Sequence, residues 1–275
     1  MNSKKTIKTL ILAAAVTLGA TSVQAAGSGV HIPSREWSFS GIFGTYDRSE
    51  LQRGFQVFRN VCSACHSMDL LAFRNLGALG YNDDEVKAIA AEYQVQDGPN
   101  DDGDMFDRPA TPADHWPSPF PNEKAAAAAN GGAAPPDLSL MAKARGSGGD
   151  SALRISLLQP AGFPLGADYL YALLTGYEET PPADASIPAG KYYNHYFPGH
   201  AISMAPPLAE GSVDYSDGTA ATVDQMAHDV SVFLNWVSEP ELNERKNIGI
   251  KVMLFLIVLT IMLYALKRKI WSDIH

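Results

Sequence analysis

"FRNVCSACHSMD", residues 58–69, contains both cysteines of the 275-residue chain, Cys62 and Cys65, and places His66 directly after the second. Three explanations compete for this spacing: a structural disulfide, a redox-active Cys-x-x-Cys pair, or two thioether bonds to haem with the histidine as an iron ligand. A disulfide across two intervening residues closes a small loop and stabilises a fold weakly. A thiol–disulfide enzyme is expected beside a βαβ pattern, which the sequence lacks. Because only the haem explanation uses all three residues, the sequence predicts one covalently bound haem c.

The opposite face of such a haem needs a second axial ligand. The loop "YFPGHAISMAPPL", residues 196–208, offers two candidates, Met204 and His200. Prolines on both sides of the methionine restrict the backbone, so the thioether can be held near the iron without a helix. Met141 and Met226 are expected on helix faces, where packing explains them. The sequence favours Met204 and leaves His200 open. A His/Met pair raises the reduction potential and closes the iron to small molecules, which suits electron transfer.

Residues 1–25 have the features of a secretory signal peptide. Three lysines precede the apolar stretch "TLILAAAVTL", and "VQA" forms a small-residue cleavage site. We expect cleavage after Ala25, with an uncleaved signal anchor as the alternative. Residues 26–242 would then form an exported haem domain.

The other end of the chain carries a second apolar stretch, "NIGIKVMLFLIVLTIMLYAL", residues 247–266, which is interrupted only by Lys251. A helix of this length spans about 30 Å, enough to cross the hydrocarbon core of a bilayer. The sequence therefore predicts a transmembrane anchor at 243–267, surrounded by membrane lipid. Basic residues flank both ends of the anchor, so their count does not set its orientation. The export signal does, and it leaves residues 268–275 as a short cytoplasmic tail.

The charge of the chain narrows its possible partners. The net charge is −9, and removal of a signal peptide with three lysines and no acid lowers it to −12. Acidic residues cluster at 82–85, 97–107 and 177–179. Such a surface disfavours nucleic acid and favours a basic protein partner, because complementary charge accelerates association. The alternative is that the acids only keep an exported domain soluble.

The exported body is expected to be mainly α-helical with long irregular loops. Capping signatures predict helices after Asp47 and Thr222, and apolar spacing predicts another after Asn82. Short helices are expected at 123–129 and 168–177.

Between these helices, residues 94–122 are acidic and then rich in proline, and residues 180–221 are rich in proline, glycine and tyrosine. Both segments are expected to be loops. A polar linker at 241–246 is expected before the anchor. The sequence shows no convincing strand, no internal repeat and no glycine-rich phosphate loop.

Four stretches occur in a characteristic order: "VCSACHSMDLLAFRNL" at 61–76, "APPDLS" at 134–139, "LLTGY" at 173–177 and the methionine loop at 196–208, followed by a single C-terminal membrane helix. Together they resemble the cytochrome c1 family, the haem subunits of cytochrome bc1 complexes. The resemblance extends from about Trp37 to Trp271.

Carried over by position, the resemblance implies that Cys62 and Cys65 attach the haem, that His66 is the proximal ligand, and that Met204 rather than His200 is the distal one.

The resemblance also implies that Arg145 pairs with a haem propionate and that Tyr169 lines the haem pocket. An ordinary surface role for the arginine and a packing role for the tyrosine are the alternatives. Residues 146–166 look longer than the family's compact form.

The implied function is a one-electron relay from the Rieske iron–sulfur protein through the haem to a soluble cytochrome c, with cytochrome b as the membrane partner. The chain would be the electron carrier of a ubiquinol–cytochrome c reductase, a proton-translocating oxidoreductase. It would be anchored by one helix in a bacterial inner membrane, with its haem domain on the periplasmic side. The nearest alternative is a free-standing, membrane-anchored cytochrome c that shuttles electrons to an oxidase. A haem peroxidase or ligand sensor would need an open sixth coordination site.

Overall fold

The computed structural model describes residues 30–146, 166–183 and 185–272. The chain divides into two compact units, Met1–Val30 and His31–His275, of which the first lies almost entirely outside the described residues. The predicted signal peptide, nearly all of the 146–166 segment and the last three residues of the predicted cytoplasmic tail also lie outside them.

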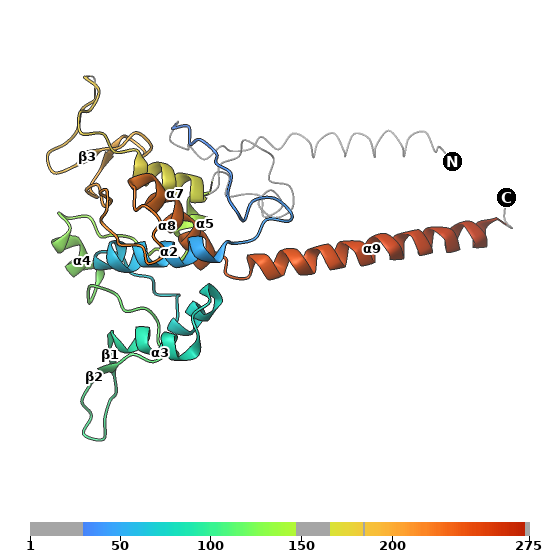
Figure 1. Cartoon of the computed structure of the whole chain (residues 1–275), viewed down its shortest axis with the longest axis horizontal. Coiled ribbons are helices and arrows are strands. Elements are labelled where there is room, and N and C mark those ends of the chain that lie inside the picture. Colours follow the sequence, from blue (N-terminus) through green and yellow to red (C-terminus); the bar gives the residue numbers. More distant parts are fainter. Residues whose placement is uncertain (1–29, 147–165, 184, 273–275) are drawn as a thin grey trace, which may run out of the picture. The chain divides into compact units, whose positions relative to one another are not determined.

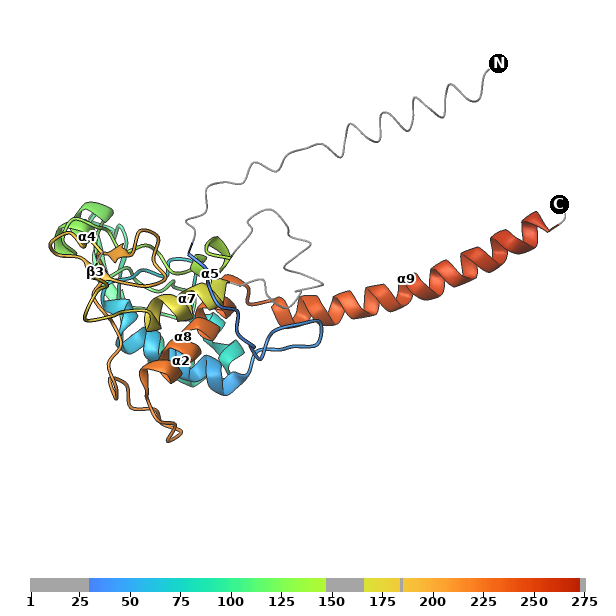
Figure 2. The ribbon, with the colours of Figure 1, turned by 90° about the horizontal axis from the view of Figure 1, so that it is seen from above.

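Helix α8, Val223–Ser238, is the central element of the second unit. Helices α2 (Arg48–Asn60), α5 (Met141–Ala144) and α7 (Gly166–Thr175) pack against it, and Figures 1 and 2 show α2 and α7 beside α8 from two directions. The sequence predicted an apolar stripe on this helix. The buried surface is wider than that stripe and includes the polar residues Asp229 and Ser231. The prediction of a mainly helical body is confirmed.

Helices α2 and α8 approach each other closely at Gly54. A Cβ atom there would lie 2.1 Å from the carbonyl oxygen of Asp229 and 2.6 Å from the Cβ of Phe233, so glycine is required at this position. On the same helix, the rings of Phe55 and Phe58 both lie 5.7 Å from the ring of Phe233. This packing fixes the end of α2, and the cysteine motif follows directly from that end.

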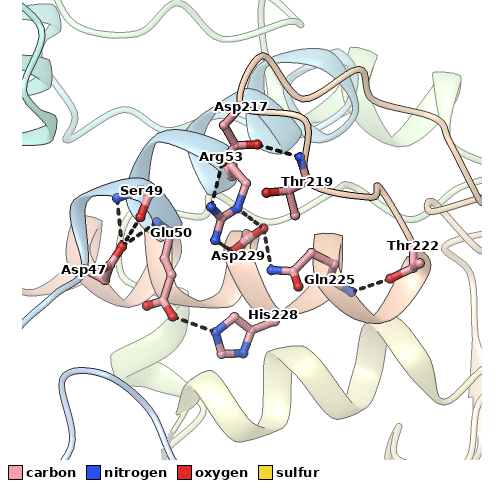
Figure 3. A network of polar contacts seen from close by, with 10 residues as sticks. All are labelled: Asp47, Ser49, Glu50, Arg53, Asp217, Thr219, Thr222, Gln225, His228 and Asp229. Atoms are coloured by element: carbon pink, nitrogen blue, oxygen red, sulfur yellow. Dashed lines mark hydrogen bonds and ion pairs between the residues drawn. The ribbon is translucent and has the colours of Figure 1, made fainter.

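A polar network crosses the same helix interface, as Figure 3 shows. Arg53 of α2 donates from Nε and Nη2 to the carboxylate of Asp229, at 2.9 and 3.1 Å, and from Nη1 to Asp217 at 2.9 Å. Gln225 adds a third donor to Asp229 at 3.0 Å. Asp229 is fully buried, and such a charge is tolerated because it is paired and hydrogen-bonded.

The predicted helix starts are confirmed by their caps. The carboxylate of Asp47 accepts from the amide of Glu50 at 3.1 Å, and the Thr222 hydroxyl accepts from the amide of Gln225 at 3.1 Å. Asn82 caps helix α3, Asp83–Ala91, and α4 covers Glu123–Ala129 as predicted.

The region after α3 differs from its prediction. Residues 94–122 contain a hairpin of strands β1 (Gln94–Asp97) and β2 (Phe106–Pro109). Farther along the chain, the two-residue strands β3 (Tyr192–Tyr193) and β4 (Ala201–Ile202) pair at the methionine loop. The expectation that there were no strands was therefore wrong. The side chains of β1 and β2 are mostly polar, and an ion pair between Asp97 and Arg108 joins the two strands.

Trp116 holds this region on the body. Its indole is buried, and its amide donates to the carbonyl of Leu71 at 2.8 Å. The ring lies 5.3 Å from Phe58 and Phe73 and 4.5 Å from Tyr93. Phe73 begins the 3-10 helix η2, Phe73–Leu79, which continues from the cysteine motif.

Helix α9 runs from Leu242 to Trp271 and has a mean hydropathy of 2.4 over an 18-residue window. Among the described residues it is the one helix long and apolar enough to cross a membrane. Residues 242–246 of the predicted polar linker are helical and form the first turn of α9, which begins one residue before the predicted anchor at 243–267. Burial of Leu242 and an ion pair between Arg245 and Glu239 at 2.6 Å stabilise this first turn.

Candidate haem site

The cysteine motif forms one tight turn at the end of α2. The 3-10 helix η1 covers Cys62–Ala64, and the amides of Cys65 and His66 both donate to the carbonyl of Cys62, at 3.1 and 2.9 Å. Cys62 and Cys65 are not joined by a disulfide. Burial, followed by the nearby Cys65, raises the pKa of the Cys62 thiol to about 12. Reactive Cys-x-x-Cys pairs lower a thiol pKa, so this environment argues against thiol–disulfide chemistry.

The imidazole of His66 is oriented by a segment far away in the sequence. Its Nδ1 lies 2.8 Å from the carbonyl oxygen of Pro136. A carbonyl only accepts hydrogen bonds, so Nδ1 carries the proton and Nε2 keeps its lone pair. Burial, which outweighs the hydrogen bond to Pro136, lowers the pKa of His66. The ring is therefore held in the neutral form that binds metal, with one nitrogen available.

Asp137 fastens that segment to the residues after the motif. Its carboxylate accepts from the Ser67 hydroxyl at 2.9 Å, from the Asp69 amide at 2.8 Å and from the Ser139 amide at 2.8 Å. Burial alone would raise the pKa of Asp137, but these hydrogen bonds together lower it. The amide of Leu138 completes the attachment by donating to the carbonyl of Ser67 at 2.9 Å. Sequence reasoning missed Pro136 and Asp137, although "APPDLS" was among the matching stretches.

Met204 lies in a half-buried position just after β4. The hydroxyl of Tyr177, which follows α7, donates to its carbonyl oxygen at 3.1 Å. Burial and the neighbouring Tyr169 raise the pKa of Tyr177, so its hydroxyl keeps its proton as a donor. The segment that follows α7 thus holds the backbone of Met204 through one side chain, whose role the sequence analysis had not identified.

Asn194 organises the rest of the methionine loop. Its side chain is fully buried; Nδ2 donates to the carbonyl of Leu173 at 2.7 Å, and Oδ1 accepts from the amides of Tyr196 and Phe197 at 3.0 and 3.1 Å. All three of these hydrogen bonds join the Asn194 side chain to backbone groups, as expected for a buried side chain that holds a turn.

The alternative ligand, His200, is engaged in the loop itself. Its backbone is left-handed, with a φ of 58°, its Nδ1 lies 3.2 Å from the carbonyl of Asn194, and its ring stacks on Tyr193 at 5.7 Å. Met141 and Met226 pack in or against the core, which confirms their expected packing role.

Arg145 and Tyr169 are brought together. The guanidinium carbon of Arg145, just after α5, lies 5.7 Å from the ring centroid of Tyr169 in α7, within cation–π range. Arg145 is exposed, whereas Tyr169 is 9% exposed. The segment holding Pro136 leads directly into α5, so the same stretch serves both the histidine and the arginine.

These donors fit haem c better than a bare ion. Within the described ranges, no three His, Cys, Asp or Glu side chains gather as a metal site. Two thiols on one turn, an imidazole with Nε2 available and a thioether on a separate loop are instead the kinds of donor that a covalently held haem uses. The fold and the site therefore define a c-type cytochrome with a membrane anchor.

Comparison with known proteins gives the family. The profile of the "Cytochrome C1 family" matches residues 37–274, and the chain belongs to the cytochrome c1 family. It is similar to the cytochrome c1 of Rhodospirillum rubrum, at 51% identity over 284 residues, 98% of each chain. It is also similar to "Cytochrome c1, heme protein, mitochondrial" of Saccharomyces cerevisiae, at 43% identity over 94% of this chain and 78% of the relative.

A third relative is longer. "Cytochrome b/c1" of Bradyrhizobium diazoefficiens is 48% identical over 97% of this chain, which corresponds to 39% of that relative's length. Family membership makes the chain the haem-carrying electron-transfer subunit of a cytochrome bc1 complex, with one covalently bound haem c, and disfavours a free-standing shuttle.

Proposed function

We propose that Cys62 and Cys65 attach the haem through thioether bonds, with His66 as the proximal and Met204 as the distal iron ligand. When bound, haem c supplies a one-electron ferric–ferrous couple. The hydrogen bond from His66 to Pro136, at 2.8 Å, carries the proposal. It presents a neutral imidazole with Nε2 available, as the carbonyls and carboxylates that hydrogen-bond to metal-ligating histidines do.

The remaining site residues orient and enclose the group. Tyr177 holds the backbone of Met204 so that the thioether is presented without a large loss of loop entropy. The exposed guanidinium of Arg145 is suited to a propionate, because its planar fork binds carboxylates in a bidentate manner. Tyr169, buried beneath that guanidinium, is suited to lining the pocket and excluding water.

The electron path follows from the family. Electrons enter from the Rieske iron–sulfur protein and leave to a soluble cytochrome c, and cytochrome b is the membrane partner. The relative whose printed name joins cytochrome b with c1 supports this last association. The net charge of −9 supports a basic acceptor. It disfavours nucleic acid, which is also negatively charged and would be repelled. The chain acts as a carrier within a proton-translocating ubiquinol–cytochrome c reductase.

The membrane arrangement divides the chain into four parts: a signal peptide at 1–25, a periplasmic haem domain at 26–242, an anchor at 243–267 and a cytoplasmic tail at 268–275 of a bacterial inner membrane protein. Exposed apolar side chains along α9 support the anchor. At its far end, the Lys267 ammonium lies 4.7 Å from the Trp271 ring centroid, a pairing suited to the headgroup region.

The variant Met204→Leu tests the ligand assignment. We expect loss of the near-infrared sulfur-to-iron absorption and a lower midpoint potential, because a leucine cannot donate to iron. Met105→Leu is the matched control, since Met105 is exposed in the β1–β2 hairpin. If Met204→Leu kept both the band and the potential of the control, the assignment would be wrong.

Purification of the complex in mild detergent tests the proposed partners, which should include cytochrome b and the Rieske protein.

A further inference from the structure

Residues 38–45 form a loop that is closed at its base. The amide of Thr45 donates to the carbonyl of Ser38 at 3.1 Å. Next to this closure, the rings of Phe39 and Tyr46 are buried and their centroids lie 5.1 Å apart. The base of the loop is therefore fastened to the domain by apolar packing.

Two glycines set the shape of the loop above that base. A Cβ atom at Gly44 would lie 1.9 Å from the carbonyl oxygen of Ser40, which leaves no room for any side chain. Gly41 has a φ of 71°, in the left-handed region that glycine adopts without strain. The tip of the loop, residues 41–43, is thus held in one tight turn.

The tip carries two exposed apolar side chains. Ile42 is 42% exposed and Phe43 is 82% exposed. The exposed fraction of Phe43 is larger than that of any other large apolar residue in the described part of the chain, the membrane helix included. Water is an unfavourable environment for such groups, and a contiguous apolar projection indicates a contact outside the domain.

The same loop is hydrogen-bonded to the beginning of the anchor. The Nζ of Lys246 donates to the carbonyl oxygens of Phe39 and Gly44, at 2.6 and 2.9 Å. Lys246 directly precedes the apolar run 247–266. Gly44 and Phe43 are neighbours, with Cα atoms about 3.8 Å apart. The exposed ring therefore lies within a side chain's reach of the level at which the membrane span begins.

We propose that Ile42 and Phe43 insert into the lipid headgroup region beside α9 and form a second contact between the haem domain and the membrane. Apolar groups at that depth leave water without entering the hydrocarbon core. The lipid is favoured as the occupant because the tip adjoins the anchor itself, through the hydrogen bonds of Lys246 to Phe39 and Gly44 at the start of the apolar run. A single helix allows the domain to swivel about its axis, whereas two contacts hold one orientation. The proposal rests on α9 crossing the membrane.

A spin label at position 43 tests this in the full-length haem protein in phospholipid vesicles. The variant Phe43→Cys would carry a nitroxide label. Its collision rate with oxygen, which concentrates in lipid, is compared with its collision rate with a water-soluble nickel chelate. Met105→Cys is the matched control, because Met105 is 53% exposed in the loop between β1 and β2. We expect an oxygen-to-nickel ratio several-fold higher at position 43. Equal ratios at the two positions would overturn the proposal.

Two further measurements separate the possible failures. The wild-type chain should take up no label, because both of its cysteines are bound to haem. Uptake of label would contradict the haem attachment. The membrane contact would then be judged from the difference in oxygen-to-nickel ratio between Phe43→Cys and Met105→Cys. The second measurement repeats the experiment on the intact complex. A label that is aqueous in vesicles and immobilised only beside the other subunits would show that protein covers the tip, and it would overturn the lipid contact.

Discussion

His66 and Pro136 are joined by a hydrogen bond of 2.8 Å between the imidazole Nδ1 and the proline carbonyl, across 70 residues of sequence. The proline carbonyl decides which nitrogen of the ring carries the proton. The position of that carbonyl depends in turn on Asp137, which ties its segment to Ser67 and Asp69. The orientation of the proposed proximal ligand is therefore a property of two segments, and not of the cysteine motif alone.

Asp137→Asn tests this dependence. Removing the charge weakens three hydrogen bonds, and we expect a loss of about 1–2 kcal/mol in the free energy of unfolding at neutral pH. The folded pKa of Asp137 is lowered from 3.8, so its contribution is complete above that unfolded value and is lost as the pH falls through the folded pKa. The difference between wild type and variant should therefore shrink in acid. Denaturant unfolding at pH 7 and pH 3, followed by haem absorbance, measures it.

Asp101→Asn is the control for that experiment, since Asp101 is an exposed acid in the β1–β2 loop. It should leave the stability unchanged at both pH values. A loss for Asp137→Asn that is the same at pH 3 as at pH 7 would show that its charge is not what stabilises the segment.

Tyr177→Phe removes the donor to the Met204 carbonyl while keeping the ring. We expect a cost of about 1 kcal/mol in stability and a more easily displaced thioether, because the loop is held by one contact fewer. Carbon monoxide binding to the reduced protein reports the displacement and should become faster than in wild type. Tyr192→Phe changes an exposed tyrosine of strand β3, next to the loop, and should behave as wild type. Equal binding rates in both variants would contradict a positioning role for Tyr177.

Asn194→Ala leaves the carbonyl of Leu173 and two amides without their buried partner. We expect about 3 kcal/mol of destabilisation, from the cost of unsatisfied buried polar groups, together with weakened near-infrared absorption. Asn100→Ala is a matched change, because Asn100 accepts from two backbone amides in an exposed loop, at 3.0 and 2.8 Å. It should cost less and leave the iron ligands unaffected. A normal sulfur-to-iron band in Asn194→Ala would separate this residue from ligand positioning.

Gly54→Ala forces apart helices α2 and α8. The added methyl group would lie 2.1 Å from the Asp229 carbonyl, so we expect about 3 kcal/mol of destabilisation or more from overpacking. Gly77→Ala has nothing within 4 Å of the new methyl group and should be neutral or slightly stabilising. Thermal unfolding of the full chain in detergent measures both. Similar melting temperatures for the two variants would show that the helix contact yields easily.

Much of the architecture was predictable because it depends on neighbours in sequence. The caps at Asp47 and Thr222 act within three residues of the helix start, and the anchor follows from a continuous apolar run. The β1–β2 hairpin was missed because its strands are polar and short, and they are joined by contacts such as the one between Asp97 and Arg108. The predicted start of the anchor, residue 243, lies one residue from the start of α9, but the sequence did not show that Leu242 is buried in the core of the domain.

The candidate site divides in the same way. Local spacing was sufficient to predict haem-binding roles for Cys62, Cys65 and His66, because two thiols and an imidazole within five residues have few other uses. It could not reveal that Pro136 orients the histidine or that Asn194 and Tyr177 hold the methionine loop. Those contacts join segments that are distant along the chain, and they exist only once the packing around α8 brings them within hydrogen-bonding distance.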